Sequence, residues 1–226
     1  QDTYTLHKPV RRKFSRGRII VGGIDHQWQA DLIDVRNLRK ENDGTNYLLT
    51  CIDVLSKYVW VILLKNKTGQ ALVRAFEDIL STGRKPLKLQ TDKGTEFRNK
   101  IFQQFLKQRG IGFFVTENED IKASVVERFN RTLKEKLWRY FTRKNTRRYV
   151  EILQPLVRTY NGTYHRSIKK APANVKVSNQ EEVWQTLYGS PEKVRSYQPR
   201  FKKGDTVRIS KARRTFKKGY LPSWTE

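Results

Sequence analysis

The spacing of apolar residues changes along the chain, and each spacing predicts a type of element. Alternating or continuous apolar runs predict five strands, over residues 27–35, 47–53, 58–64, 87–91 and 111–115. Intervals of three and four residues predict long helices over residues 68–80, 97–109, 124–144 and 146–162, with short helical pieces at 171–172 and 180–187. Short turns, one of them at Asn42-Asp43-Gly44, separate the first three strands and predict an antiparallel meander.

The fourth and fifth strands alternate with helices, which is typical of parallel neighbours joined by crossovers. The pattern therefore predicts an α/β fold: a mixed five-stranded sheet with helices on both faces, with the first and fourth strands as central neighbours. Thr68 is expected to cap the first long helix, and Ile101 is expected to face the core. Pro155 predicts a kink or a short break in the last long helix.

The two ends of the chain carry few core-forming patterns. Residues 1–23 hold six cations against the single acid Asp2, which predicts a basic arm or linker, or a solvated tail. Residues 24–188 predict the folded body, and residues 189–200 predict a linker. Residues 201–226 include an alternating run over 206–209 but are too few to bury a core alone, so they predict the start of a small, truncated β-barrel.

Composition adds a partner to this picture. Apolar residues make up 37% of the chain, which supports a packed core, yet 47 Lys and Arg against 22 Asp and Glu leave a net charge of +25. So large an excess predicts a polyanionic partner, and nucleic acid is the first candidate. A membrane partner has no support, because the longest apolar run, Val59 to Leu64, is far shorter than the roughly 20 residues of a spanning helix.

Cysteine and histidine usage excludes other classes. The single Cys51 sits among apolar neighbours and predicts a reduced core thiol in an intracellular compartment. One Cys and three His cannot build a zinc finger within this sequence. His26 is close in sequence to an acid, and we interpret it as a surface or capping residue.

Three acids stand at positions that the predicted topology brings to one edge. Asp31 lies in the first strand, Asp92 ends the fourth strand, and Glu127 opens the helix after the fifth. Clustered carboxylates repel one another, and a divalent cation removes that penalty. Oxygen ligands favour Mg²⁺ or Mn²⁺, and two such ions can drive an in-line phosphoryl displacement. Gly94 is expected to permit a sharp turn after Asp92.

Other interpretations of these acids stay open. Asp34, Asp53 and Glu96 meet the same spacing requirements. Each acid could also be an ordinary strand-end or helix-start residue, since a Glu in the first turn is favoured by the helix macrodipole.

Basic residues surround the predicted site. Arg131 and Lys134 follow Glu127 by four and seven residues, so they share its helix face and are expected to hold a phosphate backbone. Arg128 and Lys122 are further candidates; a solvated helix face is the alternative. The C-terminal piece adds cations expected to contact DNA without sequence preference, among them Lys202, Lys203, Arg208, Arg213 and Arg214.

Three motifs, in this order, carry a family resemblance: Trp28-Gln29-Ala30-Asp31, residues 91–97 (TDKGTEF) and residues 125–134 (VVERFNRTLK). They resemble the retroviral-type integrase core, the D,D-E branch of the RNase H-like superfamily. The interval from Asp92 to Glu127 is one residue shorter than is usual there, and we attribute the difference to the preceding loop. Residues 160–172, 200–208 and 218–222 resemble the segments that follow this core, including a C-terminal barrel or chromodomain-like module. The resemblance is closest to integrases of Maverick/Polinton-type transposons and virophages.

The resemblance implies a function and a set of partners. Asp31, Asp92 and Glu127 would be metal ligands, and the reactions would be trimming of the element's 3′ DNA ends and their transfer to target DNA. It implies a homo-oligomer, a dimer or tetramer, acting in the nucleus on chromosomal DNA, and a zinc-binding module before the core that this sequence lacks. The alternatives are a plain RNase H-like nuclease and a domesticated, non-catalytic DNA-binding protein; the basic tail argues against the first and the three intact acids against the second.

Overall fold

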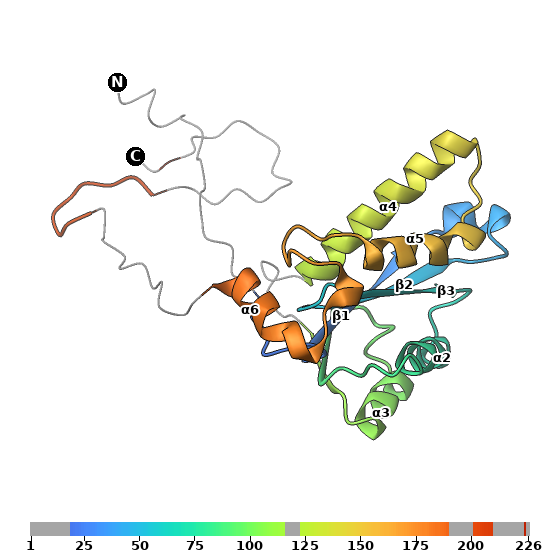
Figure 1. The fold of residues 1–226 in the computed structure, drawn as a ribbon, viewed down its shortest axis with the longest axis horizontal. Helices are drawn as coiled ribbons and strands as arrows, with labels where there is room; N and C mark the ends of the chain where they lie inside the picture. The colour runs from blue at the N-terminus through green and yellow to red at the C-terminus, as the bar shows by residue number, and fades with distance from the viewer. Residues whose placement is uncertain (1–18, 116–122, 190–200, 210–223, 225–226) are drawn as a thin grey trace. The chain divides into compact units, whose positions relative to one another are not determined.

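The computed structural model describes residues 19–115, 123–189, 201–209 and 224. The chain divides into two compact units, residues 19–191 in one and residues 1–18 with 192–226 in the other. The first unit contains all the helices and strands of the described residues (Figure 1). No helix in the described ranges combines the length and the apolarity needed to cross a membrane.

A single mixed sheet forms the centre of the first unit. Its strands are β1 (Gln27–Asp34), β2 (Tyr47–Asp53), β3 (Val59–Leu64), β4 (Lys88–Thr91) and β5 (Gly112–Val115). Their spatial order is β3-β2-β1-β4-β5. The β1–β2 and β2–β3 pairs are antiparallel, and the β1–β4 and β4–β5 pairs are parallel. The predicted sheet is confirmed, with the first and fourth strands as central neighbours.

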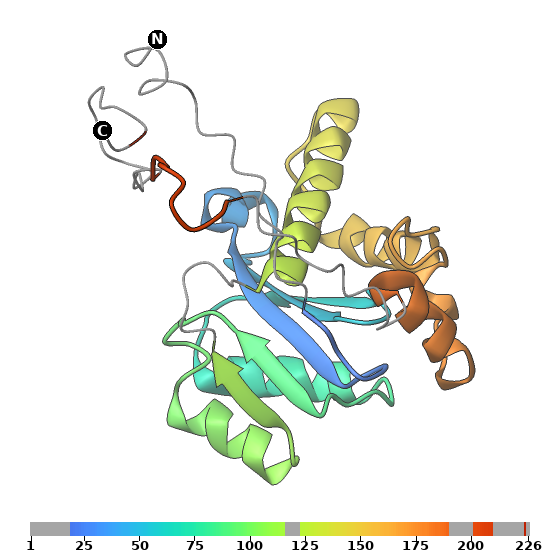
Figure 2. The same ribbon diagram turned by 90° about the vertical axis from the view of Figure 1, so that its left-hand side faces the viewer.

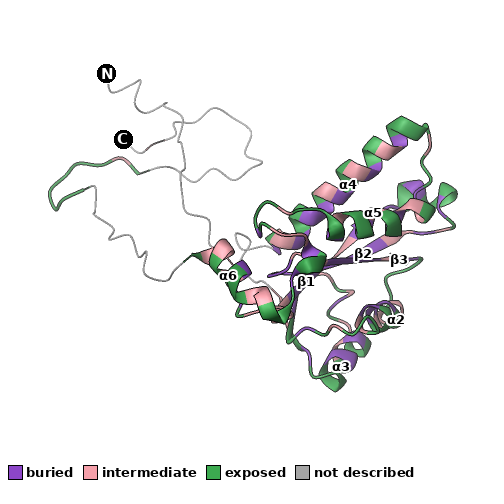
Figure 3. Ribbon diagram, viewed as in Figure 1, coloured by how far each residue is buried: buried purple, intermediate pink, exposed green. Residues whose placement is uncertain are grey.

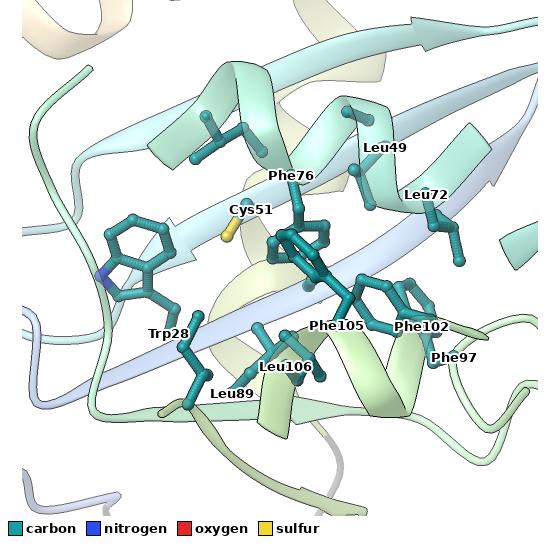
Figure 4. Close-up of a cluster of buried hydrophobic side chains, with 14 of the residues drawn as sticks. Trp28, Leu49, Cys51, Leu72, Phe76, Leu89, Phe97, Phe102, Phe105 and Leu106 are labelled. Carbon is teal, nitrogen blue, oxygen red and sulfur yellow. The ribbon is translucent and has the colours of Figure 1, made fainter. Parts of the chain in front are cut away.

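Helices cover both faces of this sheet (Figures 1 and 2). On one face lie α2 (Gly69–Leu80) and α3 (Lys100–Gln108), and on the other lie α4 (Ser124–Lys144) and α5 (Val150–Gly162). The last helix, α6 (Gln180–Tyr188), packs on residues that follow β2, and short 3₁₀ helices lie at Arg36–Glu41, Pro172–Asn174 and Val177–Asn179. Trp28 and Ala30 of β1 join the core under α2 and α3 (Figure 4), whereas Ile33 joins the core under α4 and α5. Asp31 alternates with Ala30 along β1, so it lies on the α4 face.

The long helix α4 has the predicted bounds, and its buried residues form one inner stripe (Figure 3). The expected cap on α2 is also confirmed, because the Thr68 side chain accepts the Ala71 N–H. The prediction for Ile101 is wrong, since its side chain is 51% exposed. Asn99 caps α3 by accepting the Phe102 N–H, so the helix starts three residues later than predicted.

Pro155 is accommodated inside α5, which runs without the predicted break. The proline removes one donor, which would have bonded the carbonyl of Glu151 one turn earlier. Glu151 is exposed, so water can satisfy that carbonyl. The helix itself begins at Val150 rather than at Thr146.

The predicted N-terminal arm ends earlier than residue 23. Val21 is 1% exposed and packs with Val183 of α6, and its carbonyl accepts the Trp184 Nε1–H. Residues 19–23 therefore complete the body instead of forming a linker, because their apolar side chains cover a third small core. Residues 1–18, where the arm stays a prediction, lie outside the described residues.

The predicted C-terminal strand is wrong. In the second unit, residues 202–205 form a turn with Gly204 at φ +103°, and residues 206–209 are irregular. Phe201, Val207 and Ile209 are 65%, 47% and 68% exposed, so their side chains are not part of a buried core. No barrel is seen in the described part of this unit. The proposed 189–200 linker lies almost wholly outside the described residues.

Candidate active site

The three predicted acids lie on elements that meet at one region of the fold. Asp31 lies in β1, opposite Thr50 of β2. Asp92 follows β4, the parallel neighbour of β1. Glu127 is exposed in the first turn of α4, the helix that packs on β1 and β2.

Asp31 and Glu127 line one open pocket of about 390 Å³. The α4 residues Asn130, Arg131 and Lys134 line the same pocket. Glu127, Arg131 and Lys134 thus share a face of α4, as their spacing predicts. The pocket brings three carboxylates, those of Asp31, Asp34 and Glu127, together with two cations.

The Asp31 carboxyl reports the influence of the other two acids. Burial is the main cause that raises the pKa of Asp31 from its ordinary 3.8 to about 6, and the negative charges of Asp92 and Glu127 contribute to the same rise. Hydrogen bonds from the Leu32 N–H (2.8 Å) and the Asn130 Nδ2 (2.7 Å) oppose this rise. Asp92 and Glu127 therefore both act electrostatically on Asp31, as neighbouring carboxylates do.

The three acids do not lie close enough together to act as ligands of one metal ion. Among the described residues, no three His, Cys, Asp or Glu side chains stand close enough to hold one metal ion. Asp92 does not line the pocket of Asp31 and Glu127. The donor chemistry, oxygen atoms alone, suits a hard divalent cation, but binding one would require Asp92 and Glu127 to move toward Asp31.

Gly94 is needed for space and not for an unusual backbone angle. It is absent from the positive-φ glycines of the described chain. A Cβ atom at Gly94 would lie 2.8 Å from Glu96 Oε1 and 3.0 Å from Asp92 Oδ1. The Gly94 N–H donates to Asp92 Oδ1 at 3.1 Å. The expected turn after Asp92 therefore needs a glycine because the carboxylates of Asp92 and Glu96 both lie close to this position and leave no room for a side chain.

The competing acids differ in their partners. Asp53 is fully buried and accepts hydrogen bonds from Ser56 and, at 3.0 Å, from Arg84. It therefore forms a structural ion pair with Arg84. Asp34 lines the pocket, but Arg36 holds it at 2.6 Å and lowers its pKa. Glu96 lies beside Asp92 and pairs with Lys67 at 3.5 Å. Only Glu96 therefore remains a serious alternative ligand.

Comparison with known proteins shows what this chain is similar to. Residues 24–118 match the family model of the integrase core domain. This part of the chain is therefore similar to integrase core domains. A transposon-derived protein of Caenorhabditis elegans is 38% identical over 188 residues, which are 83% of this chain and 63% of that protein. The Pol polyprotein of transposon 412 of Drosophila melanogaster is 33% identical over 127 residues, 54% of this chain and 10% of that protein. The chain thus spans less than two thirds of either relative.

Solved structures share the fold of the integrase core. The catalytic core domain of HTLV-2 integrase, in complex with magnesium, aligns with a TM-score of 0.56 at 23% identity, over 67% of this chain and 95% of that one. A simian T-cell lymphotropic virus intasome aligns with a TM-score of 0.59 at 22% identity, over 92% of this chain and 68% of that one. At these identities the likeness shows the fold alone.

The predicted DNA-contact residues of the first unit fall into separate groups. Arg131 and Lys134 line the acidic pocket. Arg128 does not line it; burial, with a smaller contribution from the charge of Arg128, lowers the pKa of Lys57 to about 8. Arg128 therefore lies near Lys57, on another side of α4. Its role in DNA binding stays a prediction.

The other predicted DNA-contact residues belong to the second unit or lie outside the described ranges. Lys202 and Lys203 are exposed in the turn of the second unit, and Arg208 there is half-buried. Lys122, Arg213 and Arg214 lie outside the described residues.

Two polar residues of the first unit escape prediction from sequence. Asn130 is 7% exposed and donates to Asp31, and its Oδ1 is buried with no partner among the described residues. Gln29 is fully buried on the α4 face of β1. Asn130 adjoins Phe129 in the inner stripe of α4, and Gln29 interrupts an apolar strand. In both cases the sequence does contain a signal, namely a polar residue at a position that the apolar pattern assigns to the core.

Proposed function

We propose that this chain is the catalytic part of a DNA integrase, which trims the 3′ ends of an element's DNA and joins them to target DNA. The observation that carries the proposal is the pocket that Asp31 and Glu127 share with the cations Arg131 and Lys134, where the charge of Asp92 also acts on Asp31. Acids alone would repel a DNA backbone, and cations alone would only bind it. Their combination at one pocket suits a metal-dependent transfer at phosphorus.

Asp31, Asp92 and Glu127 would hold Mg²⁺ or Mn²⁺, two ions at full occupancy. The bound ions would activate the attacking oxygen and stabilise the leaving one. The raised pKa of Asp31 supports this assignment, because a bound cation would offset both its main cause, the burial of the carboxyl, and the smaller contribution of the charges of Asp92 and Glu127. The magnesium complex of the HTLV-2 core supports the choice of metal.

The chain's own residues would position the reactants. Asn130 donates to one oxygen of Asp31 and the Leu32 N–H to the other, so the Asp31 carboxylate has a fixed orientation. Arg131 and Lys134 extend from α4 into the same pocket. They would hold the phosphate backbone so that the scissile phosphorus faces the acids, and such positioning is a major part of phosphoryl-transfer catalysis.

The decisive experiment uses labelled oligonucleotides with element-end sequences, incubated with the protein and Mg²⁺ or Mn²⁺. Strand-transfer products longer than the substrate would support an integrase. Shortened products alone would favour a nuclease of the RNase H type. Tight DNA binding without any metal-dependent product, in a chain extended upstream to include any zinc-binding module, would favour a non-catalytic DNA-binding protein.

The pocket cations give a prediction about affinity. Replacing both Arg131 and Lys134 with Ala is expected to weaken DNA binding about tenfold at low salt, and to flatten the dependence of log affinity on log salt by about 1 to 2 units. Fluorescence anisotropy over a salt series measures both quantities. The matched control replaces Arg143 and Lys144 with Ala. This change removes the same charge from the exposed end of α4. Equal loss of strand transfer in both double variants would contradict a specific role for the pocket pair.

Assembly, origin and location complete the proposal. The HTLV-2 core occurs in dimeric and trimeric forms, and the simian virus protein occurs in an intasome, which supports a homo-oligomer, a dimer or tetramer, around DNA ends. The transposon-derived relative supports an origin in a mobile element; the finer assignment to Maverick/Polinton-type elements or virophages rests on the resemblance of the motifs. Action on chromosomal DNA would require the protein to enter the nucleus, and imaging of a tagged full-length chain would test this.

A further inference from the structure

Three glutamine side chains connect the elements that carry the three acids. Gln29 of β1 is fully buried and Gln90 of β4 is 3% exposed, and the two residues are paired in the sheet. The Gln29 Nε2 donates to the Gln90 Oε1 at 2.8 Å. The Gln27 Nε2 donates to the same oxygen at 2.7 Å. Side-chain bonds therefore reinforce the junction of β1 and β4.

The other end of the Gln29 amide holds the start of α4. Its Oε1 accepts the backbone N–H groups of Val125 at 3.0 Å and Val126 at 3.1 Å. These are the second and third residues of the helix, whose N–H groups have no intrahelical acceptor. A side chain at the N-cap usually accepts them, but the N-cap here is Ala123, which has no such group. Gln29 thus caps α4 from a strand almost 100 residues earlier.

This network lies within two residues of every acid. Gln29 precedes Asp31 by two positions in β1 and shares its strand face. Gln90 precedes Asp92 by two positions, and Val126 directly precedes Glu127. A shift of the Gln29 amide would therefore move the acids relative to one another.

We infer that Gln29 is a positioning residue for the proposed reaction. It fixes the start of α4, and so Glu127, against Asp31, and through Gln90 it fixes Asp92 against both. This inference rests on the proposed function. Gln29 is fully buried and contacts no reacting group, so it acts only through the backbone that carries the acids.

The amide is required because the position needs an acceptor on one side and a donor on the other. A methionine of similar length would remove both, leaving the Val125 and Val126 N–H groups buried without acceptors. Unsatisfied groups of this kind favour displacement of the helix start. The substitution would therefore alter the spacing of the acids as well as lower the stability of the fold.

The test compares Gln29→Met with Asn161→Leu in the 226-residue chain. Asn161 is a matched control: it is 5% exposed and bonds both the N–H and the carbonyl of Val59, joining α5 to β3, neither of which carries one of the three acids. Mn²⁺ binding is measured by electron paramagnetic resonance, and hydrogen exchange by NMR, at a temperature where circular dichroism shows each protein folded. Strand transfer is measured in parallel under single-turnover conditions.

Gln29→Met is expected to weaken Mn²⁺ binding about tenfold, to slow strand transfer by about tenfold or more, and to speed exchange of the Val125 and Val126 amides. Asn161→Leu is expected to lower thermal stability while leaving Mn²⁺ affinity unchanged. Equal changes of Mn²⁺ affinity in both variants, or wild-type affinity in Gln29→Met, would overturn the inference.

A second variant covers the case in which Gln29→Met fails to fold. Gln90→Met keeps the Gln29 cap on α4 and removes the acceptor that joins β1 to β4. It is expected to retain slow exchange at Val125 and Val126 but to bind Mn²⁺ more weakly, and wild-type affinity would overturn the role of the network. If the wild-type protein binds Mn²⁺ but makes no DNA products, the proposed function fails while the metal and exchange measurements still decide the role of Gln29.

Discussion

Asp92→Asn is expected to abolish metal-dependent trimming and joining of DNA while DNA binding persists. A metal ion contributes several kcal/mol of transition-state stabilisation, and about 1.4 kcal/mol corresponds to a tenfold change in rate. Losing one ligand charge should therefore slow the reaction by about a thousandfold. The substitution is mild structurally, because the carbonyl oxygen of Asn can still accept the Gly94 N–H that Asp92 accepts at 3.1 Å.

Glu96→Gln is the matched comparison for that variant. Glu96 lies on the other side of Gly94 and pairs with the exposed Lys67. If Asp92→Asn kept its product yield and Glu96→Gln lost it, the ligand assignment would pass from Asp92 to Glu96. Anisotropy measured on the same samples separates a loss of chemistry from a loss of binding.

The sheet and α4 were predictable because their burial patterns are regular. Trp28 and Ala30 alternate with polar positions and pack on one face of β1, which places Asp31 on the opposite face. The stripe through Val126, Leu133 and Leu137 set the register of α4, and with it the face of Glu127. Local periodicity was sufficient wherever each element buries a single face.

The remainder depends on contacts between distant segments. The start of α4 is held by Gln29, and nothing near Ala123 in the sequence indicates where its cap comes from. Gln29 is visible in the sequence only as a polar residue in an apolar strand. Val21 is similar: it follows a run of cations, yet it packs against Val183 of α6. Sequence periodicity does not encode such pairings.

The charge distribution also gains meaning from the fold. A net charge of +25 predicts a polyanionic partner but gives no place for it. In the structure, Arg131 and Lys134 are next to Glu127 and Asp31 in one pocket. Attraction of a phosphate backbone by the cations and its repulsion by the acids thus act at the same point. A metal ion would turn that repulsion into attraction, so DNA and metal should bind with positive coupling.

Asp31→Asn is expected to slow DNA joining about a thousandfold, for the reason given for Asp92, and to stabilise the metal-free protein. Burial, with the charges of Asp92 and Glu127, raises the pKa of Asp31 to about 6. The folded state therefore holds this proton more tightly than the unfolded chain does. Ionisation of Asp31 therefore lowers the free energy of unfolding, and this loss develops as pH rises from about 4 to about 6.

The expected gain at pH 7 is about 1 to 2 kcal/mol, since partial exposure of Asp31 screens part of the effect. The new amide can also be satisfied, because rotation of Asn130 would present its unpartnered Oδ1 as an acceptor. Thermal unfolding at pH 7 and pH 4, with and without Mg²⁺, measures the effect. The variant should melt higher than wild type at pH 7 only, and Mg²⁺ should stabilise wild type alone. A variant that melts lower than wild type at both pH values would contradict the prediction, because removing a buried charge that lies near Asp92 and Glu127 should raise stability at pH 7, where Asp31 is ionised.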